Sequence, residues 1–182
     1  MVNTESTPSR YANALLEHTA VLAAGSLLST AAFVAVLNLF SPLDNMWLEG
    51  ALALAFYLLL FFATLAYMER YDTADWTVPA GVEDSNWPLR RTVSIVLGAL
   101  AVAVTAAAAT IWINEPVARA LMLAQSVIMA VSAANDFRRF RLPLPLTIVG
   151  LAVTAVLLAI GPYSSLIIML AIAWAAMLSL IH

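Results

Sequence analysis

The chain contains six long apolar runs, and these constrain its fold more than any other feature. They cover residues 12–40, 47–68, 92–113, 117–134, 144–160 and 163–181. A helix needs about 20 predominantly apolar residues to cross the hydrocarbon core of a bilayer. An ordinary soluble domain is near half apolar, whereas 63% of this chain is hydrophobic and only 10% is charged. Lipid is therefore the expected solvent for most of the chain.

The runs predict an all-α polytopic membrane protein. We expect a single domain over residues 1–182, a bundle of about six transmembrane helices arranged as three hairpins. The turn inside each hairpin is short and contains a proline, namely Pro42, Pro116 or Pro162. Proline suits the first turn of a helix, because its missing N–H would lack an intrahelical acceptor there anyway. The one sizeable segment outside the spans is the loop 69–91.

The arginines predict the orientation. All eight basic residues are arginine, and Arg119 is the only one on its side of the membrane when six spans are counted. The other seven are Arg10, Arg70, Arg90, Arg91, Arg138, Arg139 and Arg141. Cytoplasmic flanks of membrane spans accumulate Lys and Arg. The prediction is a multi-pass protein of the cell membrane with its N-terminus, its C-terminus and the loop 69–91 in the cytoplasm.

Small residues recur every four positions in the third span, at Ala99, Ala103 and Ala107. The hydrophobic effect does not draw helices together in lipid, so small residues that permit close backbone approach mark packing surfaces. These alanines predict a helix-packing face inside the bundle. Docking to another subunit is the alternative.

The fourth span is the most polar and begins near Glu115 and Arg119. These residues are four positions apart, which places their side chains on one helical face as a pair. A topological anchor at the outer interface is the simpler interpretation. Contact with an anion or a substrate carboxylate is the alternative.

Further along the fourth span, several residues follow the spacing of one helical face. Gln125 should face protein, because an unsatisfied amide in lipid costs several kcal/mol. The stripe predicts either a hydrogen bond to another helix or the lining of a pathway or ligand site. Its members are Met122, Gln125, Met129, Ser132 and Asp136.

Glu17 and His18 lie near the cytoplasmic start of the first span. A location at the membrane interface is the simpler interpretation. A proton-carrying pair is the alternative, because histidine titrates near neutrality and burial can raise the pKa of a glutamate toward that range.

The residue types argue against cofactors. The chain has no cysteine, which excludes disulfides and thiolate metal sites. His18 lies near the start of the first span and His182 is the last residue, so we do not expect them to serve together as the axial ligands of a haem. We therefore expect no metal and no cofactor. Nucleic acid is not an expected partner either, because the net charge is −3 and the arginines are explained by topology.

Residues 135–143 read NDFRRFRLP. This segment resembles the first catalytic-aspartate motif of the prepilin and preflagellin peptidases, in which basic residues, a hydrophobic residue and a proline follow an aspartate at the cytoplasmic end of a span. The resemblance implies that Asp136 would be one carboxylate of an aspartic dyad that shares a proton. The later glycine-x-glycine-aspartate motif of that family is missing, and the segment GVED at 81–84 lies earlier in the chain.

The sequence contains no metal-ligand cluster, nucleophile triad or phosphate-binding loop. We therefore expect a non-enzymatic protein, a structural or accessory subunit of a membrane assembly. Its expected partners are the lipid bilayer and either other membrane subunits or further copies of itself. A transporter of small solutes or ions that uses Arg119, Gln125 and Ser132 is the alternative. An aspartic membrane peptidase is the more remote one.

Overall fold

The computed structural model describes residues 7–40, 45–71, 87–139 and 144–160. These residues form five helices, α1 (Thr7–Phe40), α2 (Met46–Tyr71), α3 (Trp87–Trp112), α4 (Pro116–Arg139) and α5 (Leu144–Ile160). Helices α1 to α4 are long and apolar enough to cross a membrane, and α5 is an apolar helix of 17 residues. The all-helical prediction is confirmed, and four of the described helices could span a membrane, as a membrane protein would require. The predicted span 163–181 lies outside the described residues, so the count of six stays a prediction.

A proline is the first or second residue of four of the five described helices. Pro116 is the first residue of α4, as predicted, and Pro8, Pro88 and Pro145 are the second residues of α1, α3 and α5. Pro42 and Pro162 fall outside the described residues. Several helices continue beyond the apolar runs, and α4 extends from the predicted end at 134 to Arg139. Hydropathy marks only the part of a helix that suits lipid, whereas backbone hydrogen bonding continues into polar sequence.

Side chains cap the starts of α2 and α4. The Asn45 Oδ1 atom accepts hydrogen bonds from the N–H groups of Trp47 at 3.1 Å and Leu48 at 3.2 Å. At α4, the Glu115 carboxylate accepts from the N–H groups of Val117 and Ala118. The first N–H groups of a helix have no intrahelical acceptor, so both caps stabilise the helix start.

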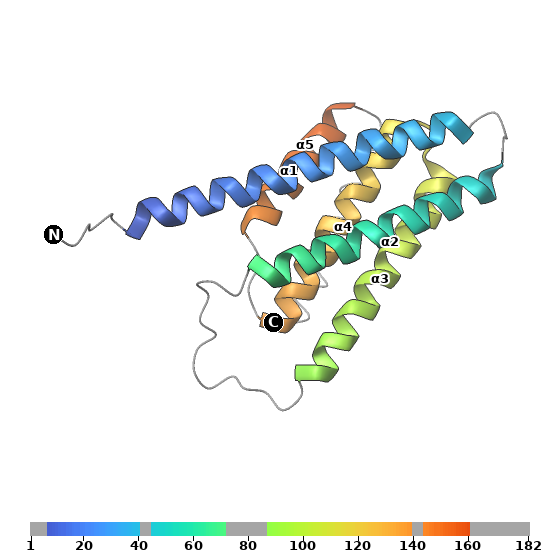
Figure 1. Ribbon diagram of the computed structural model, residues 1–182. Helices are drawn as coiled ribbons and strands as arrows, with labels where there is room; N and C mark the ends of the chain where they lie inside the picture. Colours follow the sequence, from blue (N-terminus) through green and yellow to red (C-terminus); the bar gives the residue numbers. More distant parts are fainter. Residues whose placement is uncertain (1–6, 41–44, 72–86, 140–143, 161–182) are drawn as a thin grey trace.

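Helix α4 lies at the centre of the bundle and packs against the other four helices (Figure 1). Within its most apolar 18-residue stretch 78% of the residues are buried, compared with 17% in α1. Helix α1 packs mainly against α4 and α5 and less against α2. The described bundle is therefore organised around α4, and the arrangement as three hairpins stays a prediction.

The directions of the helices alternate. The ion pair between Glu69 and Arg91, at 3.2 Å, joins the end of α2 to the start of α3. At the opposite end of the bundle, Glu49 and Arg119 join the starts of α2 and α4. Arg70 and Arg91 thus share one end, and Arg119 occupies the other. The predicted orientation depends on this distribution.

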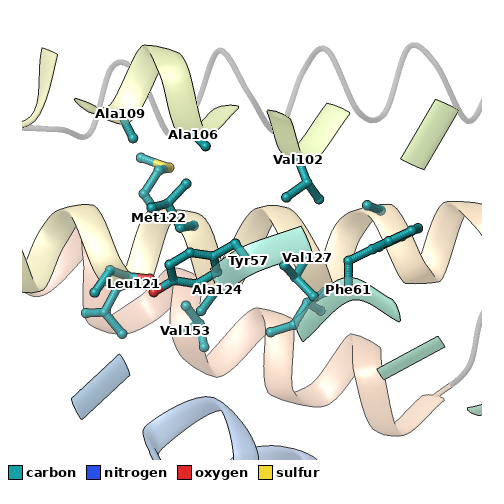
Figure 2. Packing of buried hydrophobic residues seen from close by; sticks show 14 of the residues in the cluster. Tyr57, Phe61, Val102, Ala106, Ala109, Leu121, Met122, Ala124, Val127 and Val153 are labelled. Atoms are coloured by element: carbon teal, nitrogen blue, oxygen red, sulfur yellow. Dashed lines mark hydrogen bonds between the residues drawn. The ribbon is translucent and has the colours of Figure 1, made fainter. Parts of the chain in front are cut away.

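Aromatic side chains of α1 and α2 fill the core beside α4. The Tyr57 and Phe33 rings meet edge to face, with centroids 5.0 Å apart. The Tyr57 hydroxyl donates a hydrogen bond of 3.0 Å to the Ala120 carbonyl on α4. Figure 2 shows Tyr57 among apolar side chains of α4, with Phe61 further along α2. One side chain thus supplies both a ring contact with α1 and a polar contact with α4.

Eight serine and threonine hydroxyls of the described helices form hydrogen bonds within their own helix. Each donates to a carbonyl three or four residues earlier, which satisfies the hydroxyl without a partner from another helix. These hydroxyls therefore add little polarity to the lipid-exposed surface. They belong to Thr19, Ser29, Thr30, Ser94, Thr105, Thr110, Ser126 and Thr154.

The buried face of α3 is offset from the predicted alanine stripe. Ala99 and Ala103 are half-buried and Ala107 is exposed. The stripe therefore lies at the edge of the helix interface. An alanine-rich helix carries small residues at a spacing of four on more than one face, so the spacing does not select the packed face. The buried residues of α3 are Ser94, Gly98, Val102, Ala106, Ala109 and Thr110.

Candidate functional site

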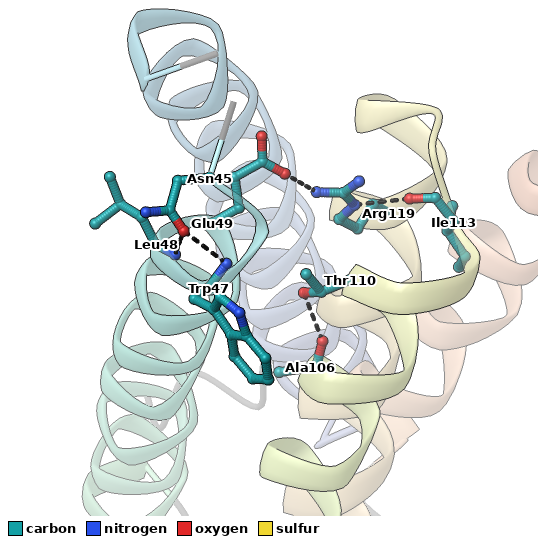
Figure 3. Close-up of polar contacts among 8 residues, drawn as sticks. All are labelled: Asn45, Trp47, Leu48, Glu49, Ala106, Thr110, Ile113 and Arg119. Carbon is teal, nitrogen blue, oxygen red and sulfur yellow. Dashed lines mark hydrogen bonds and ion pairs between the residues drawn. The ribbon is translucent and has the colours of Figure 1, made fainter. Parts of the chain in front are cut away.

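Arg119 forms buried polar contacts between helices at one end of the bundle. It lies in the first turn of α4, and only 7% of its surface is exposed. Its Nε–H donates to the Ile113 carbonyl at 2.8 Å, and its NH1 group donates to Glu49 Oε2 at 2.7 Å (Figure 3). The guanidinium thus connects the start of α4 to the start of α2 and to the segment that follows α3.

The local sequence explains why the Ile113 carbonyl is available to Arg119. Ile113 lies one residue beyond the end of α3, and the N–H of Val117, four residues later, is bonded to Glu115. A carbonyl at a helix end needs a donor from outside the helix. Arg119 supplies that donor. Glu49 lies in the first turn of α2, where the positive end of the helix dipole favours a carboxylate.

The predicted pair of Glu115 with Arg119 is wrong. Glu115 instead caps α4, and Arg119 pairs with Glu49, which is 70 residues earlier in the chain. The spacing of four identifies a neighbour on the same helix, but the free N–H groups of the first turn compete for the Glu115 carboxylate. One sequence signal pointed to the correct partner, because Glu49 is the only acidic residue in the apolar run 47–68.

Within the Arg119–Glu49 ion pair, the arginine side chain is more buried than the glutamate side chain. The side chain of Arg119 is 8% exposed and that of Glu49 is 24% exposed. Removing one partner from such a pair leaves the other charge without compensation, which is far more costly than losing an exposed ion pair. This geometry fits a structural role for Arg119, because its guanidinium already makes two hydrogen bonds within the chain.

A second polar region lies along α4 and faces α5. Gln125 and Ile128 approach Gly150 closely. A Cβ atom built on Gly150 would lie 3.2 Å from Ile128 Cγ2 and 3.6 Å from Gln125 Nε2. Met122 and Ser132 are buried, and Gln125 and Met129 are half-buried. These members of the predicted stripe therefore face protein.

Among the described side chains of α4, two amide atoms are buried without a hydrogen-bond partner. They are Oε1 of Gln125 and Nδ2 of Asn135, and Asn135 is only 4% exposed. Buried polar groups in proteins are nearly always hydrogen-bonded. Asn135 was not among the predicted site residues. Asn135 lies three residues after Ser132, and this helical spacing could have identified it as a member of the polar face. Asp136 follows in the last turn of α4, and its side chain lies outside the described part, so the resemblance to the peptidases stays a prediction.

The predicted neighbours Glu17 and His18 have different surroundings. Glu17 is exposed, whereas His18 is half-buried and its Nδ1 atom lies 3.1 Å from the Tyr67 hydroxyl on α2. Tyr67 is near the end of α2, so this contact lies at the opposite end of the bundle from Arg119. His18 helps to join α1 to α2.

The structure thus keeps the candidate polar residues in three separate places. Arg119 lies at one end, His18 at the other, and Gln125 with Ser132 along α4 between them. Among the side chains that the structure describes, no three of the types His, Cys, Asp and Glu lie together as a metal site would require. Comparison of the chain with protein-family models, with curated proteins and with solved structures found no match.

Proposed function

We propose that this membrane protein is a non-enzymatic structural or accessory subunit of a membrane assembly. The supporting observation is that Arg119 makes its polar contacts within the chain. A charged group near the end of a span is a natural contact for a ligand, yet here two directed bonds join it to Glu49 and Ile113 of the same chain. Tyr57 likewise uses its hydroxyl to join α2 to α4. Such polar contacts give the bundle a defined shape.

The outer surface of α1 supports the same proposal. Large apolar side chains lie exposed along this helix, a surface suited both to lipid and to the helices of another subunit. The proposed partners are other membrane subunits or further copies of this chain. The exposed side chains include Leu16, Leu27, Leu28 and Leu39.

Purification in a mild detergent or in native lipid discs tests the proposal. We expect the tagged chain to emerge with a partner in a fixed ratio, or as a defined oligomer. The variant Leu28→Ala should weaken this association if α1 is the docking surface, whereas the buried change Val127→Ala should instead lower the stability of the bundle. A monodisperse monomer that retains no partner in both media would contradict the proposal.

A transporter of small solutes or ions is the second candidate. The unpartnered amide atoms of Gln125 and Asn135 favour it, because polar groups at membrane depth often line a substrate pathway. The pure chain in liposomes should then move a solute or monovalent cation, and Gln125→Leu should reduce that flux. Flux equal to that of empty liposomes across a solute panel would count against this function.

We also propose that the protein lies in the cell membrane and that the end of the bundle with Arg70 and Arg91 faces the cytoplasm. The positive-inside rule supports this orientation. The chain has no native cysteine, so a single cysteine at Ser85 reports the side of its loop. An impermeant thiol reagent should leave this cysteine unlabelled in intact cells and label it after lysis. Labelling in intact cells would reverse the orientation.

A further inference from the structure

Three polar side chains of α4, those of Gln125, Ser132 and Asn135, lie on one face of the helix, which also carries Ile128. Gln125, Ile128, Ser132 and Asn135 are separated by three, four and three residues, the spacing of a single face of an α-helix. The contacts of Gln125 and Ile128 with Gly150 place this face against α5. Gln125 is near the middle of the span Pro116–Asn135, and Asn135 is at its end. At 1.5 Å per residue they are about 15 Å apart along the helix axis.

The two amides carry polar atoms that nothing in the described chain satisfies. Oε1 of Gln125 and Nδ2 of Asn135 are both buried. Exchanging the oxygen and nitrogen of either amide would still leave a polar atom at the same place. A polar group held in an apolar interior without a partner is destabilising, and lipid offers it none. The geometry therefore requires a hydrogen-bonding partner other than the described side chains.

We propose that water occupies the interface between α4 and α5 along Gln125, Ser132 and Asn135, and that it enters from the end of the bundle at which α4 ends. Water can both donate to the Gln125 carbonyl oxygen and accept from the Asn135 amide, and buried water commonly bridges such groups. The opposite direction is closed, because the preceding turn of α4 is packed with apolar side chains. These are Leu121, Met122 and Leu123, each at most 7% exposed. The inference does not depend on whether the protein is a subunit or a transporter.

Cysteine reactivity tests the proposal directly, because the native chain has no cysteine to confuse the signal. A thiol reacts as the thiolate, which forms in water and is suppressed in apolar surroundings. We compare Ser132→Cys with Val131→Cys, its neighbour at the same depth, whose side chain is 0% exposed. Each variant is placed in lipid discs and treated with a small cationic methanethiosulfonate reagent.

Ser132→Cys should react at least tenfold faster than Val131→Cys, and Asn135→Cys should react faster still because it is nearer the entrance. Equal rates for the cysteines at 131 and 132 would overturn the proposal. Matching unfolding midpoints for the variants ensure that the rates report water in the folded bundle.

The variant Gln125→Met gives an independent test. In a hydrated interface the methionine loses the hydrogen bonds of the amide to water, so the unfolding midpoint should fall. In a dry interface the same change removes an unsatisfied polar group, and the midpoint should rise. A raised or unchanged midpoint would overturn the proposal. Val127→Met, a change elsewhere on α4, controls for the effect of methionine itself.

Discussion

Helices α4 and α1 show opposite relations between apolarity and burial. Helix α4 is the least apolar of the four candidate spans and the most buried, whereas α1 is a very apolar span of which 17% is buried. In a water-soluble protein the more apolar helix would be expected inside. Lipid reverses this order, because an apolar side chain gains little by exchanging lipid for protein, while a polar side chain gains partners.

The comparison also explains which contacts hold the described bundle together. Helix α4 receives the Arg119–Glu49 ion pair, the Tyr57 hydroxyl and the close approach of Gly150. The side-chain contacts of α1 with α2 are aromatic packing at Phe33 and the half-exposed contact of His18 with Tyr67. Substitutions that affect α4 should therefore cost more stability than matched substitutions on α1.

The largest expected effect is that of Arg119→Leu. This change leaves the Glu49 carboxylate and the Ile113 carbonyl without their donor. We expect a loss of about 3 kcal/mol, the lower end of the cost of unpairing a buried ion pair, because Glu49 keeps some access to water. Urea unfolding of the chain in detergent or lipid measures it. The double variant Glu49→Leu/Arg119→Leu should regain part of the loss, whereas a double loss equal to the sum of the losses of Glu49→Leu and Arg119→Leu would show that the pair is not coupled.

Gly98→Ala and Gly25→Ala form the next test. A Cβ atom on Gly98 would lie 2.7 Å from Cζ of Phe61, a fully buried ring, whereas one on Gly25 of α1 meets nothing within 4 Å. We expect Gly98→Ala to lower the unfolding free energy by about 2 kcal/mol through overpacking. Gly25→Ala should raise it by about 0.5 kcal/mol, because alanine is the better helix former. The Cβ position at Gly98 of α3 is also 3.6 Å from the Ala130 carbonyl oxygen of α4, so equal effects at the two sites would remove the contrast between the packing around α4 and the exposed face of α1.

Tyr57→Phe and Tyr67→Phe compare hydroxyl contacts toward α4 and α1. Tyr57→Phe removes the buried bond to the Ala120 carbonyl and keeps the ring, so we expect a loss of about 1 kcal/mol. Tyr67→Phe removes the half-exposed contact with His18 and should cost less. The difference between the two midpoints in one detergent is the measurement. A larger loss of stability for Tyr67→Phe would mean that α1 is held more strongly by its contact with α2 than the structure indicates.

The smallest expected effect is that of Leu28→Ala on α1. The Leu28 side chain is 71% exposed, so its removal should change the unfolding free energy of the isolated chain by less than about 0.5 kcal/mol. Val127→Ala on α4, a fully buried site, should cost about 2 kcal/mol through lost contacts and a cavity. A large loss for Leu28→Ala in the isolated chain would mean that α1 packs more extensively than its exposure indicates.

Several local features could be read from the residues alone. The predicted runs 12–40, 47–68, 92–113 and 144–160 match helices to within a few residues at most ends, because length and apolarity decide which segments suit lipid. Pro116 marked the start of α4, since proline tolerates that position and few others in a helix. The separation of Arg119 from Arg70 and Arg91 also followed from counting spans.

The tertiary structure decided which helix is central, which face of α3 is buried and which acid pairs with Arg119. An apolar side chain in a membrane is equally suited to contact with protein and with lipid. The periodicity of apolar residues therefore carries little information about which face of a helix packs against the bundle. Ala99, Ala103 and Ala107 show this, because their spacing is regular and their burial is not. The partners Glu49 and Arg119 are 70 residues apart, and only the packing of α2 against α4 brings their side chains to 2.7 Å.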